Sequence, residues 1–217
     1  MTHSAKDHAL AIIKAGINLV PIVGGPIASL IGDYVPTSTQ AAIEHSTELL
    51  AQKLDTLKDR IDVEALNKDD FSELFKSCYL VIARTNREEK LQAAAAILAN
   101  LLLRPDDPKK SSYEELDHLI RCIDALSIGA IAVLGAARTT AATSGQGTQR
   151  SFQFGQLRTS FPEFEPSLLM SLVSELRALN LVRVQEGGIR MPDYGELLVE
   201  VTPIGLRLVE QFIEGKT

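Results

Sequence analysis

Near its C-terminus the chain carries two short runs rich in β-branched residues, Leu181–Val184 and Leu197–Val201, with Gly187–Gly188 between them. Such runs, separated by a glycine-containing loop, predict two strands. The first run directly follows an apolar-periodic helix expected over Pro166–Asn180, and the second leads into a closing helix expected from Pro203. Helix, strand, loop, strand and helix in this order are typical of a winged helix-turn-helix, a fold that binds either DNA or protein.

The region before this part of the chain predicts a bundle of helices. We expect helices over Thr39–Arg60, from Asp69 onward and over Glu88–Leu103, because apolar residues recur along one side of each. The stretch Arg104–Lys110 contains two prolines and two aspartates and is the clearest linker in the sequence. It places the expected boundary between two domains after residue 107.

The residues after this linker lead into the winged helix. Ser112 and Glu115 have the spacing of a capping box, which predicts a long helix from Tyr113 to about Ala137. The segment Thr139–Ser151 is small and polar, contains glycine, and is expected to be a mobile loop. A short helix near Phe154–Ser160 precedes Pro166. The expected fold class is mainly α, with a helical bundle over residues 1–107 and a winged-helix domain with a small two-stranded β wing over residues 108–217.

The segment Ala9–Ile31 is almost wholly apolar, and prolines and glycines near its middle predict two short helices joined by a tight bend within residues 9–35. A straight helix of about 20 apolar residues can cross a membrane, but a charge such as Lys14 near mid-bilayer costs roughly 3 kcal/mol. A buried hairpin in the bundle is therefore favoured over a membrane- or partner-binding hairpin. In the second interpretation the binding side chains are Ile12, Ile13, Ile17, Val20, Ile22, Val23 and Ile27.

The helix Pro166–Asn180 occupies the position that reads DNA in winged-helix regulators. Its outward residues are mainly three serines, Glu175, Arg177 and Ala178, and base reading usually needs Arg, Lys, Asn or Gln. Glu163 and Glu165 precede it, and the chain has a net charge of −6, so phosphates would be repelled. Protein binding is therefore favoured over DNA binding. The candidate contacts with either kind of partner are Arg158, Ser167, Ser171, Arg177, Arg183 and Arg190.

Motif spacing argues against an enzyme. The four histidines are scattered, and the sequence has no Cys-x-x-Cys or His-x-x-x-His pair, so no metal or cofactor is expected. Cys78 and Cys122 lie among apolar residues and are expected as buried thiols in a reducing compartment. No secretory signal pattern is evident at the start of the chain, so the expected location is the cytoplasm.

Several runs together resemble one bacterial family. They are Arg87–Leu91, Ala96–Leu102 followed by the Pro/Asp linker, a helix with Leu119, Ile123, Leu126 and Ser127, and the terminal Leu179-x-Leu181-Val182 and Val201-Thr202-Pro203-x-Gly205. In this order, over roughly Arg87–Phe212, the chain resembles bacterial proteins of the abortive-infection alpha type. The resemblance implies a helical protein with a winged-helix-like C-terminal part and, through the family's name, a link to phage defence. It implies no catalytic residue.

These features predict a non-enzymatic interaction protein whose winged-helix domain binds a protein partner. A DNA-binding transcriptional regulator is the first alternative. A membrane-active effector that acts through the N-terminal hairpin is the second. The alanine-rich helix Glu88–Leu103 also offers a surface that can pack against a second copy of the chain, as in a homo-oligomer.

Overall fold

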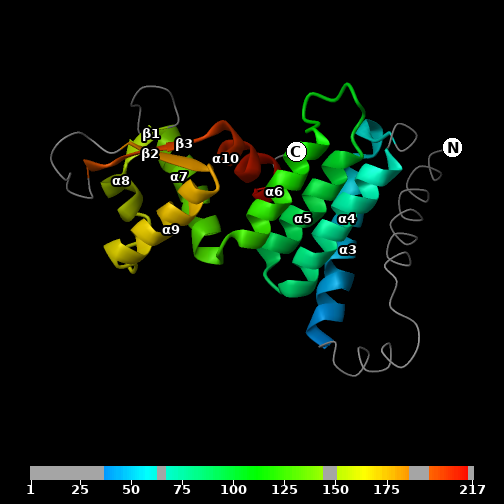
Figure 1. The fold of residues 1–217 in the computed structure, drawn as a ribbon, viewed down its shortest axis with the longest axis horizontal. Helices are drawn as coiled ribbons and strands as arrows, with labels where there is room; N and C mark the ends of the chain where they lie inside the picture. Colours follow the sequence, from blue (N-terminus) through cyan, green and yellow to red (C-terminus); the bar gives the residue numbers. More distant parts are fainter. Residues whose placement is uncertain (1–36, 63–66, 144–150, 186–195, 215–217) are drawn as a thin grey trace. The chain divides into compact units, whose positions relative to one another are not determined.

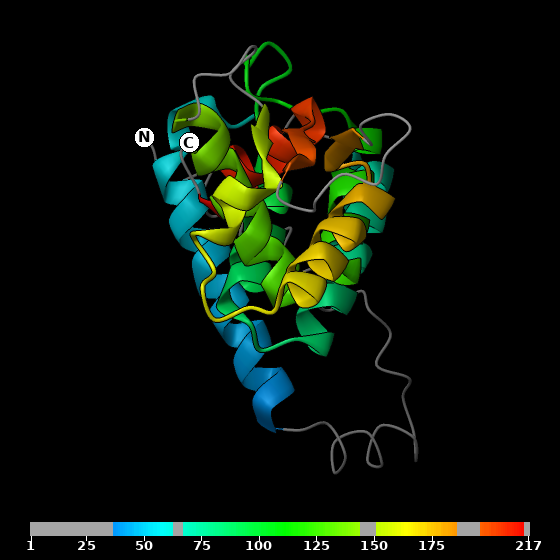
Figure 2. The same cartoon turned by 90° about the vertical axis from the view of Figure 1, so that its left-hand side faces the viewer.

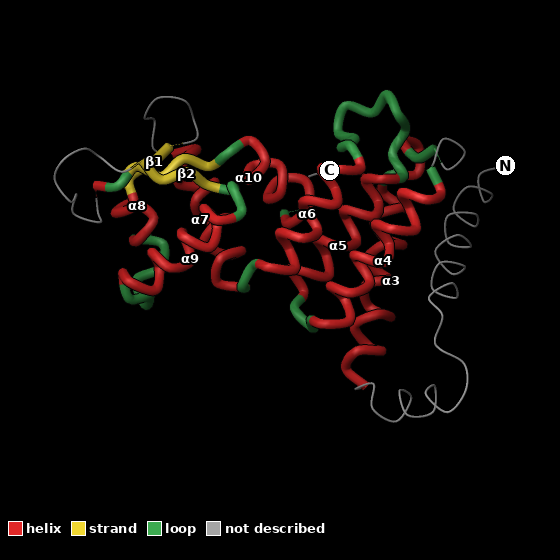
Figure 3. The backbone as a smooth tube through the Cα atoms, viewed as in Figure 1, coloured by secondary structure: helices red, strands yellow, loops and turns green. Residues whose placement is uncertain are grey.

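The computed structural model describes residues 37–62, 67–143, 151–185 and 196–214. Within these ranges the chain is mainly helical and carries a small three-stranded antiparallel sheet (Figures 1 and 3). It divides into two compact units, unit 1 (Met1–Asp124) and unit 2 (Ala125–Thr217). The hairpin expected within residues 9–35, with the apolar side chains assigned to it, lies outside the described residues, and so does Arg190.

Unit 1 is a helical bundle, as the apolar periodicity predicts. Its elements are α3 (Thr37–Thr56), the 3₁₀ turn η1 (Lys58–Arg60), α4 (Lys68–Arg84), α5 (Glu88–Leu101) and α6 (Tyr113–Ala125). Helices α3, α4 and α5 pack against one another in all three pairings (Figure 1). Polar contacts join α6 to α4 at both ends. The Tyr113 hydroxyl donates to Glu73 at 3.0 Å, and Arg84 donates to Asp124 at 3.1 Å.

The core helix of the bundle is α5. From Ala93 to Leu101 every residue is buried, including the alanine run Ala93–Ala96. Side chains this small let neighbouring helices approach closely, and α3 and α4 both pack on α5. The alanines therefore pack within their own chain, and the homo-oligomer expected from this helix stays a prediction.

Short polar side chains fix where these helices begin. Asn67 Oδ1 accepts hydrogen bonds from the backbone N–H of Asp69 and Asp70 at the start of α4, at 3.0 and 3.4 Å. Ser112 Oγ accepts from the backbone N–H of Glu115 at 3.2 Å, which confirms the predicted cap of α6.

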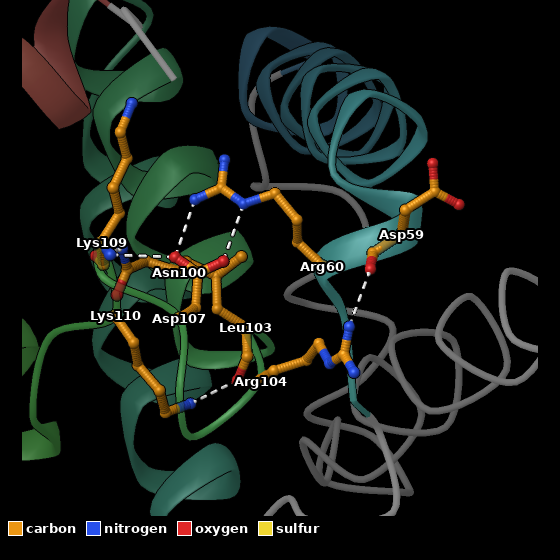
Figure 4. Close-up of polar contacts among 8 residues, drawn as sticks. All are labelled: Asp59, Arg60, Asn100, Leu103, Arg104, Asp107, Lys109 and Lys110. Atoms are coloured by element: carbon orange, nitrogen blue, oxygen red, sulfur yellow. Dashed lines mark hydrogen bonds and ion pairs between the residues drawn. The ribbon is translucent and has the colours of Figure 1, made fainter.

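The Pro/Asp linker after α5 belongs to unit 1. Figure 4 shows Asp107 held by Arg60, the last residue of η1, through two hydrogen bonds at 2.7 and 2.8 Å. The backbone N–H of Arg104 donates to Arg60 O at 2.8 Å. Asp107 Oδ1 also accepts from the backbone N–H of Lys109 at 2.9 Å. These contacts fold the linker back onto the bundle, so the chain divides after Asp124 rather than after residue 107 as expected.

Two further side chains complete this polar cluster, which we call the linker clasp. Lys110 Nζ donates to the carbonyl oxygens of Leu101 and Leu103 at 2.8 and 2.7 Å, where α5 ends and its carbonyls lack helical partners. The buried Asn100 side chain accepts from Ser111 N at 2.9 Å and donates to Lys109 O at 2.8 Å. The clasp thus satisfies the carbonyl oxygens of Leu101 and Leu103 and both polar atoms of the Asn100 amide.

The long helix expected from Tyr113 to about Ala137 is two helices, α6 and α7 (Ile128–Thr143). Ser127 makes the break. Its Oγ accepts from the backbone N–H of Ala130 at 3.1 Å, and its carbonyl accepts from Ile131 N at 3.1 Å. This is helix N-capping, which requires a non-helical Ser127. Helix α7 also runs through Thr143, so the loop expected from Thr139 begins later.

Unit 2 combines helices with the sheet. Its elements are α7, β1 (Ser151–Gln153), α8 (Phe154–Arg158), α9 (Pro166–Ala178), β2 (Val182–Gln185), β3 (Leu198–Val201), α10 (Pro203–Arg207) and the π-helical turn η3 (Leu208–Ile213). Helix α7 packs against α9, α8 and the sheet (Figure 2). Phe152, Phe154 and Phe212 are fully buried and fill the core of this unit.

The sheet has the strand order β1-β3-β2, with antiparallel pairing throughout. Both strands expected from the β-branched runs are present. The strand β1 is an addition to these two, because Ser151 ends the segment that the sequence predicts to be a loop. In the observed register Phe152, Val199 and Val184 lie side by side across the sheet, as do Ser151, Glu200 and Arg183. The first row contains the buried Phe152 and Val199, and the second contains the exposed Arg183.

The junction between α9, β2 and α10 is held by Asn180, Thr202 and Gly205. Asn180 takes a left-handed φ of 57°, and the backbone N–H of Leu181 donates to Leu176 O at 3.0 Å, which is a Schellman ending of α9. Thr202 Oγ1 donates to Asn180 O at 2.7 Å and accepts from Gly205 N at 3.1 Å. An added Cβ on Gly205 would overlap the carbonyl oxygen of Leu181. Thr202 and Gly205 therefore tie α10 to the end of α9.

The closing helix expected from Pro203 begins as the α-helix α10. It continues as η3, in which the hydrogen bonds follow the wider π-helical pattern. Arg138 of α7 holds this end of the chain. It donates to Glu210 at 3.2 Å and to Glu214 at 3.3 Å.

Among the described residues, none of the helices taken singly has the length and apolar composition of a membrane span. Only α6 and α7 considered together, across the break at Ser127, reach that composition.

Candidate functional site

Helix α9 is held firmly in unit 2 by its buried side. Leu169, Leu172, Val173 and Leu176 are buried, as the helical periodicity predicts. The helical period alone places Glu175 on the outward side. Instead its carboxylate accepts hydrogen bonds from the backbone N–H and, at 3.0 Å, from the hydroxyl of Ser127 at the start of α7. Glu175 therefore positions α9 rather than contacting a partner.

The outward side of α9 carries only short side chains along one line. Ser167, Ser171, Ser174 and Ala178 recur every three or four residues, and all are exposed. Ser171 Oγ donates back to Ser167 O at 3.0 Å, and Ser174 Oγ donates to Met170 O at 2.8 Å. Hydroxyl protons used within the helix are not available to a base edge. This face therefore lacks the long donors that direct readout of DNA requires.

The candidate arginines are distributed over three elements. Arg158 ends α8, Arg177 lies in the last turn of α9, and Arg183 lies on β2; all are exposed. Arg183 stands opposite Glu200 in the sheet register. Arg177 is about 15 Å along the helix from Ser167 at 1.5 Å per residue. The structure thus places Ser167 and Ser171 together and does not gather the arginines on one element.

A different surface forms where the chain enters α9. We call it the α9 entry surface and define it by Phe161, Glu163, Phe164, Glu165 and Leu168. The rings of Phe161 and Phe164 stack with centroids 5.1 Å apart. Leu168, in the first turn of α9, is 47% exposed. Both glutamates are exposed.

Sequence reasoning took Glu163 and Glu165 only as a reason against DNA and missed the apolar members of this surface. A signal was present. Leu168 does not belong to the inward set of α9, and two of the seven phenylalanines stand within four residues of each other in the connection before that helix. Apolar residues that fall outside the helical period are candidates for contact with a partner.

The buried thiols offer no nucleophile. Burial raises the pKa of Cys78 far above its usual range and raises that of Cys122 to about 11. The structure does bring His118 Nε2 to 3.5 Å from Cys122 Sγ, a pair that sequence reasoning did not identify. A reactive cysteine needs a lowered pKa, so this pair lacks the property that nucleophilic catalysis requires.

We expect both thiols to stay unmodified when the native protein is treated with Ellman's reagent at mildly alkaline pH, because burial keeps them protonated. Both should react fully in denaturant, which serves as the control for total thiol. Rapid reaction of Cys122 in the native protein would contradict the burial described here.

Metal-binding side chains do not cluster in the part of the chain that the structure describes. No group of three or more His, Cys, Asp or Glu side chains there is placed to hold an ion. In the linker clasp, the side chains of Asp107, Asn100 and Lys110 are all bound to groups of unit 1. That cluster is structural.

Comparisons of this chain with protein-family models, with curated proteins and with solved structures found no significant match. The resemblance to abortive-infection alpha proteins therefore stays a prediction, and function is inferred from the geometry of the chain's own residues.

Proposed function

We propose that the chain is a non-enzymatic interaction protein in which unit 2 is a winged-helix module that binds another protein. The order α7, β1, α8, α9, β2, β3 supports the winged-helix part of this proposal, as does an antiparallel sheet of order β1-β3-β2. In this arrangement α9 is the recognition helix, and β2 and β3 are the strands of the wing. A role in phage defence is what the resemblance implies for such a module.

The observation that carries the protein-binding role is the composition of the α9 entry surface. Leu168 and the stacked Phe161–Phe164 pair present apolar area next to exposed Glu163 and Glu165. Aromatic side chains are enriched in the cores of protein–protein interfaces. A DNA-binding surface at the same place would be rich in Lys and Arg and would meet phosphates. Exposed carboxylates repel phosphates, so this surface favours a protein partner.

Site-specific photo-crosslinking in the cells that make the protein tests this proposal. A benzophenone amino acid replaces Ser171 in the full chain, because Ser171 is exposed, lies within one turn of Leu168 and bonds only within its own helix. We expect irradiation to give a discrete adduct that protease removes and nuclease does not. The matched control is the same replacement at Ser72, an exposed residue of α4 in unit 1.

Two results would overturn the proposal. A nuclease-sensitive adduct from position 171 would show that the surface meets nucleic acid, as the DNA-binding alternative requires. Equal adducts from positions 171 and 72 would show that the reaction reports random collision and not a binding surface.

A further inference from the structure

We infer, building on the proposed protein-binding role, that the α9 entry surface recognises a peptide segment in which an apolar side chain is flanked by lysines or arginines. Leu168, Phe161 and Phe164 would contact the apolar side chain of that segment. Glu163 and Glu165 would contact its cations. The inference rests on exposed or partly exposed apolar and acidic side chains that lie within eight residues of one another along the chain, before and within the first turn of α9.

The apolar part of the surface is accessible. Leu80 and Leu168 are the large apolar side chains exposed among the described residues, at 51% and 47%. Leu80 lies on α4 between the exposed cationic residues Lys76 and Arg84. Leu168 instead follows two partly exposed phenylalanines closely in the chain. Burial of Leu168 and these two rings against a partner's side chain removes more apolar area from water than burial of a single leucine does.

The surface is also preorganised. Pro162 and Pro166 fix their own φ angles, and Pro166 occupies the first helical position of α9. The backbone N–H of Phe164 donates to Phe161 O at 3.1 Å, and that of Leu169 donates to Glu165 O at 3.0 Å. A connection fixed in this way loses little conformational entropy when a ligand binds.

Charge selects the partner. Glu163 and Glu165 are exposed, and neither forms an ion pair within the ranges that the structure describes. Two such carboxylates beside apolar area attract cations and disfavour anionic partners. A second copy of this chain carries a net charge of −6, and DNA and anionic phospholipids are also negative. The occupant that complements this surface in both charge and polarity is a basic, apolar peptide segment of another protein.

Selection from a phage-displayed random-peptide library against the full chain tests this inference. We expect enriched peptides with an apolar residue among Lys or Arg. The best of them, carrying a fluorescent label, should bind with an affinity that falls as salt rises. Leu168→Asp should weaken binding roughly tenfold or more, as loss of an interface anchor does. Leu80→Asp is the matched control, because it changes the other exposed leucine, and should leave binding unchanged.

Removing the charges of Glu163 and Glu165 tests the preference for a basic peptide separately from the protein-binding role on which this inference rests. Glu163→Gln with Glu165→Gln should weaken the labelled basic peptide between about twofold and thirtyfold, the range for two exposed ion pairs, and should flatten its salt dependence. The control pair is Glu89→Gln with Asp106→Asn, two exposed acids of unit 1. Far-UV circular dichroism and thermal melting check that each variant is folded.

Each outcome has a distinct meaning. Enrichment of neutral or acidic peptides that need Leu168 but not the glutamates would overturn the charge inference and leave the protein-binding role standing. Peptides that bind equally to Leu168→Asp, or a library with no enrichment over the uncoated surface, would overturn the inference. If such a result occurred while position 171 still gave a Leu168-dependent protein adduct in cells, the proposed function would survive with a partner of another kind.

Discussion

Gly205→Ala is expected to destabilise unit 2 by about 3 kcal/mol, at the upper end of the cost of overpacking. The added Cβ would overlap the carbonyl oxygen of Leu181, with the carbonyl carbon of that residue only 3.0 Å away. Both neighbours are backbone, so no flexible side chain can move aside. The N–H of Gly205 is also bonded to Thr202 Oγ1, and a shift of α10 would weaken that cap. Urea denaturation followed by far-UV circular dichroism measures the change.

Gly135→Ala is the matched control for this prediction. Gly135 lies within α7, and a Cβ there meets no atom within 4 Å. Alanine is the better helix former, so this variant should be stabilised by about 0.5 to 1 kcal/mol. The two substitutions add the same methyl group and should change stability in opposite directions. A Gly205→Ala protein as stable as the wild type would refute the close contact between α10 and Leu181.

Asp107→Asn is expected to remove a pH-dependent part of the stability of unit 1. The hydrogen bonds from Arg60, together with its positive charge, lower the pKa of Asp107 to about 2 from the ordinary value near 3.8. A carboxyl whose pKa is lower in the folded state stabilises the fold above its unfolded pKa. That stability is lost as pH falls from about 4 to about 2. The Asp107 side chain is 6% exposed and Arg60 is 33% exposed, so after screening by solvent we expect roughly 1 to 2 kcal/mol.

Urea denaturation of wild type and Asp107→Asn across this pH range measures the effect as a difference between the two proteins. The wild type should be the more stable at pH 5, and the difference should shrink toward pH 2. Asp106→Asn controls for the loss of a neighbouring charge, because Asp106 is exposed, and should show little change. A difference that is independent of pH would contradict the ion pair between Arg60 and Asp107.

The sequence predicted well what depends on local period and capping. The inward residues of α4, α5 and α9 repeat at the helical spacing, and they are buried except for Leu179 at the end of α9, which was also expected inward and is partly exposed. The two strands followed from β-branched runs next to glycines. These features are encoded within about a dozen neighbouring residues, so a single sequence suffices to read them.

What the sequence did not predict depends on partners far along the chain. Ser127 stops a helix because Glu175, 48 residues later, accepts its hydrogen bonds. The strand β1 exists because β3 pairs with it, and three residues are too few to show a period. The linker joins unit 1 because Asp107 meets Arg60. In the candidate site, the serines were correctly placed on the exposed side of α9, but the apolar entry surface was missed.

The most direct test of the central claim is the photo-crosslinked adduct from position 171 in cells, compared between Leu168→Asp and Leu80→Asp. The protein-binding role predicts a nuclease-resistant adduct that is lost in Leu168→Asp and kept in Leu80→Asp. An adduct that persists in Leu168→Asp, or one that nuclease removes, would contradict it.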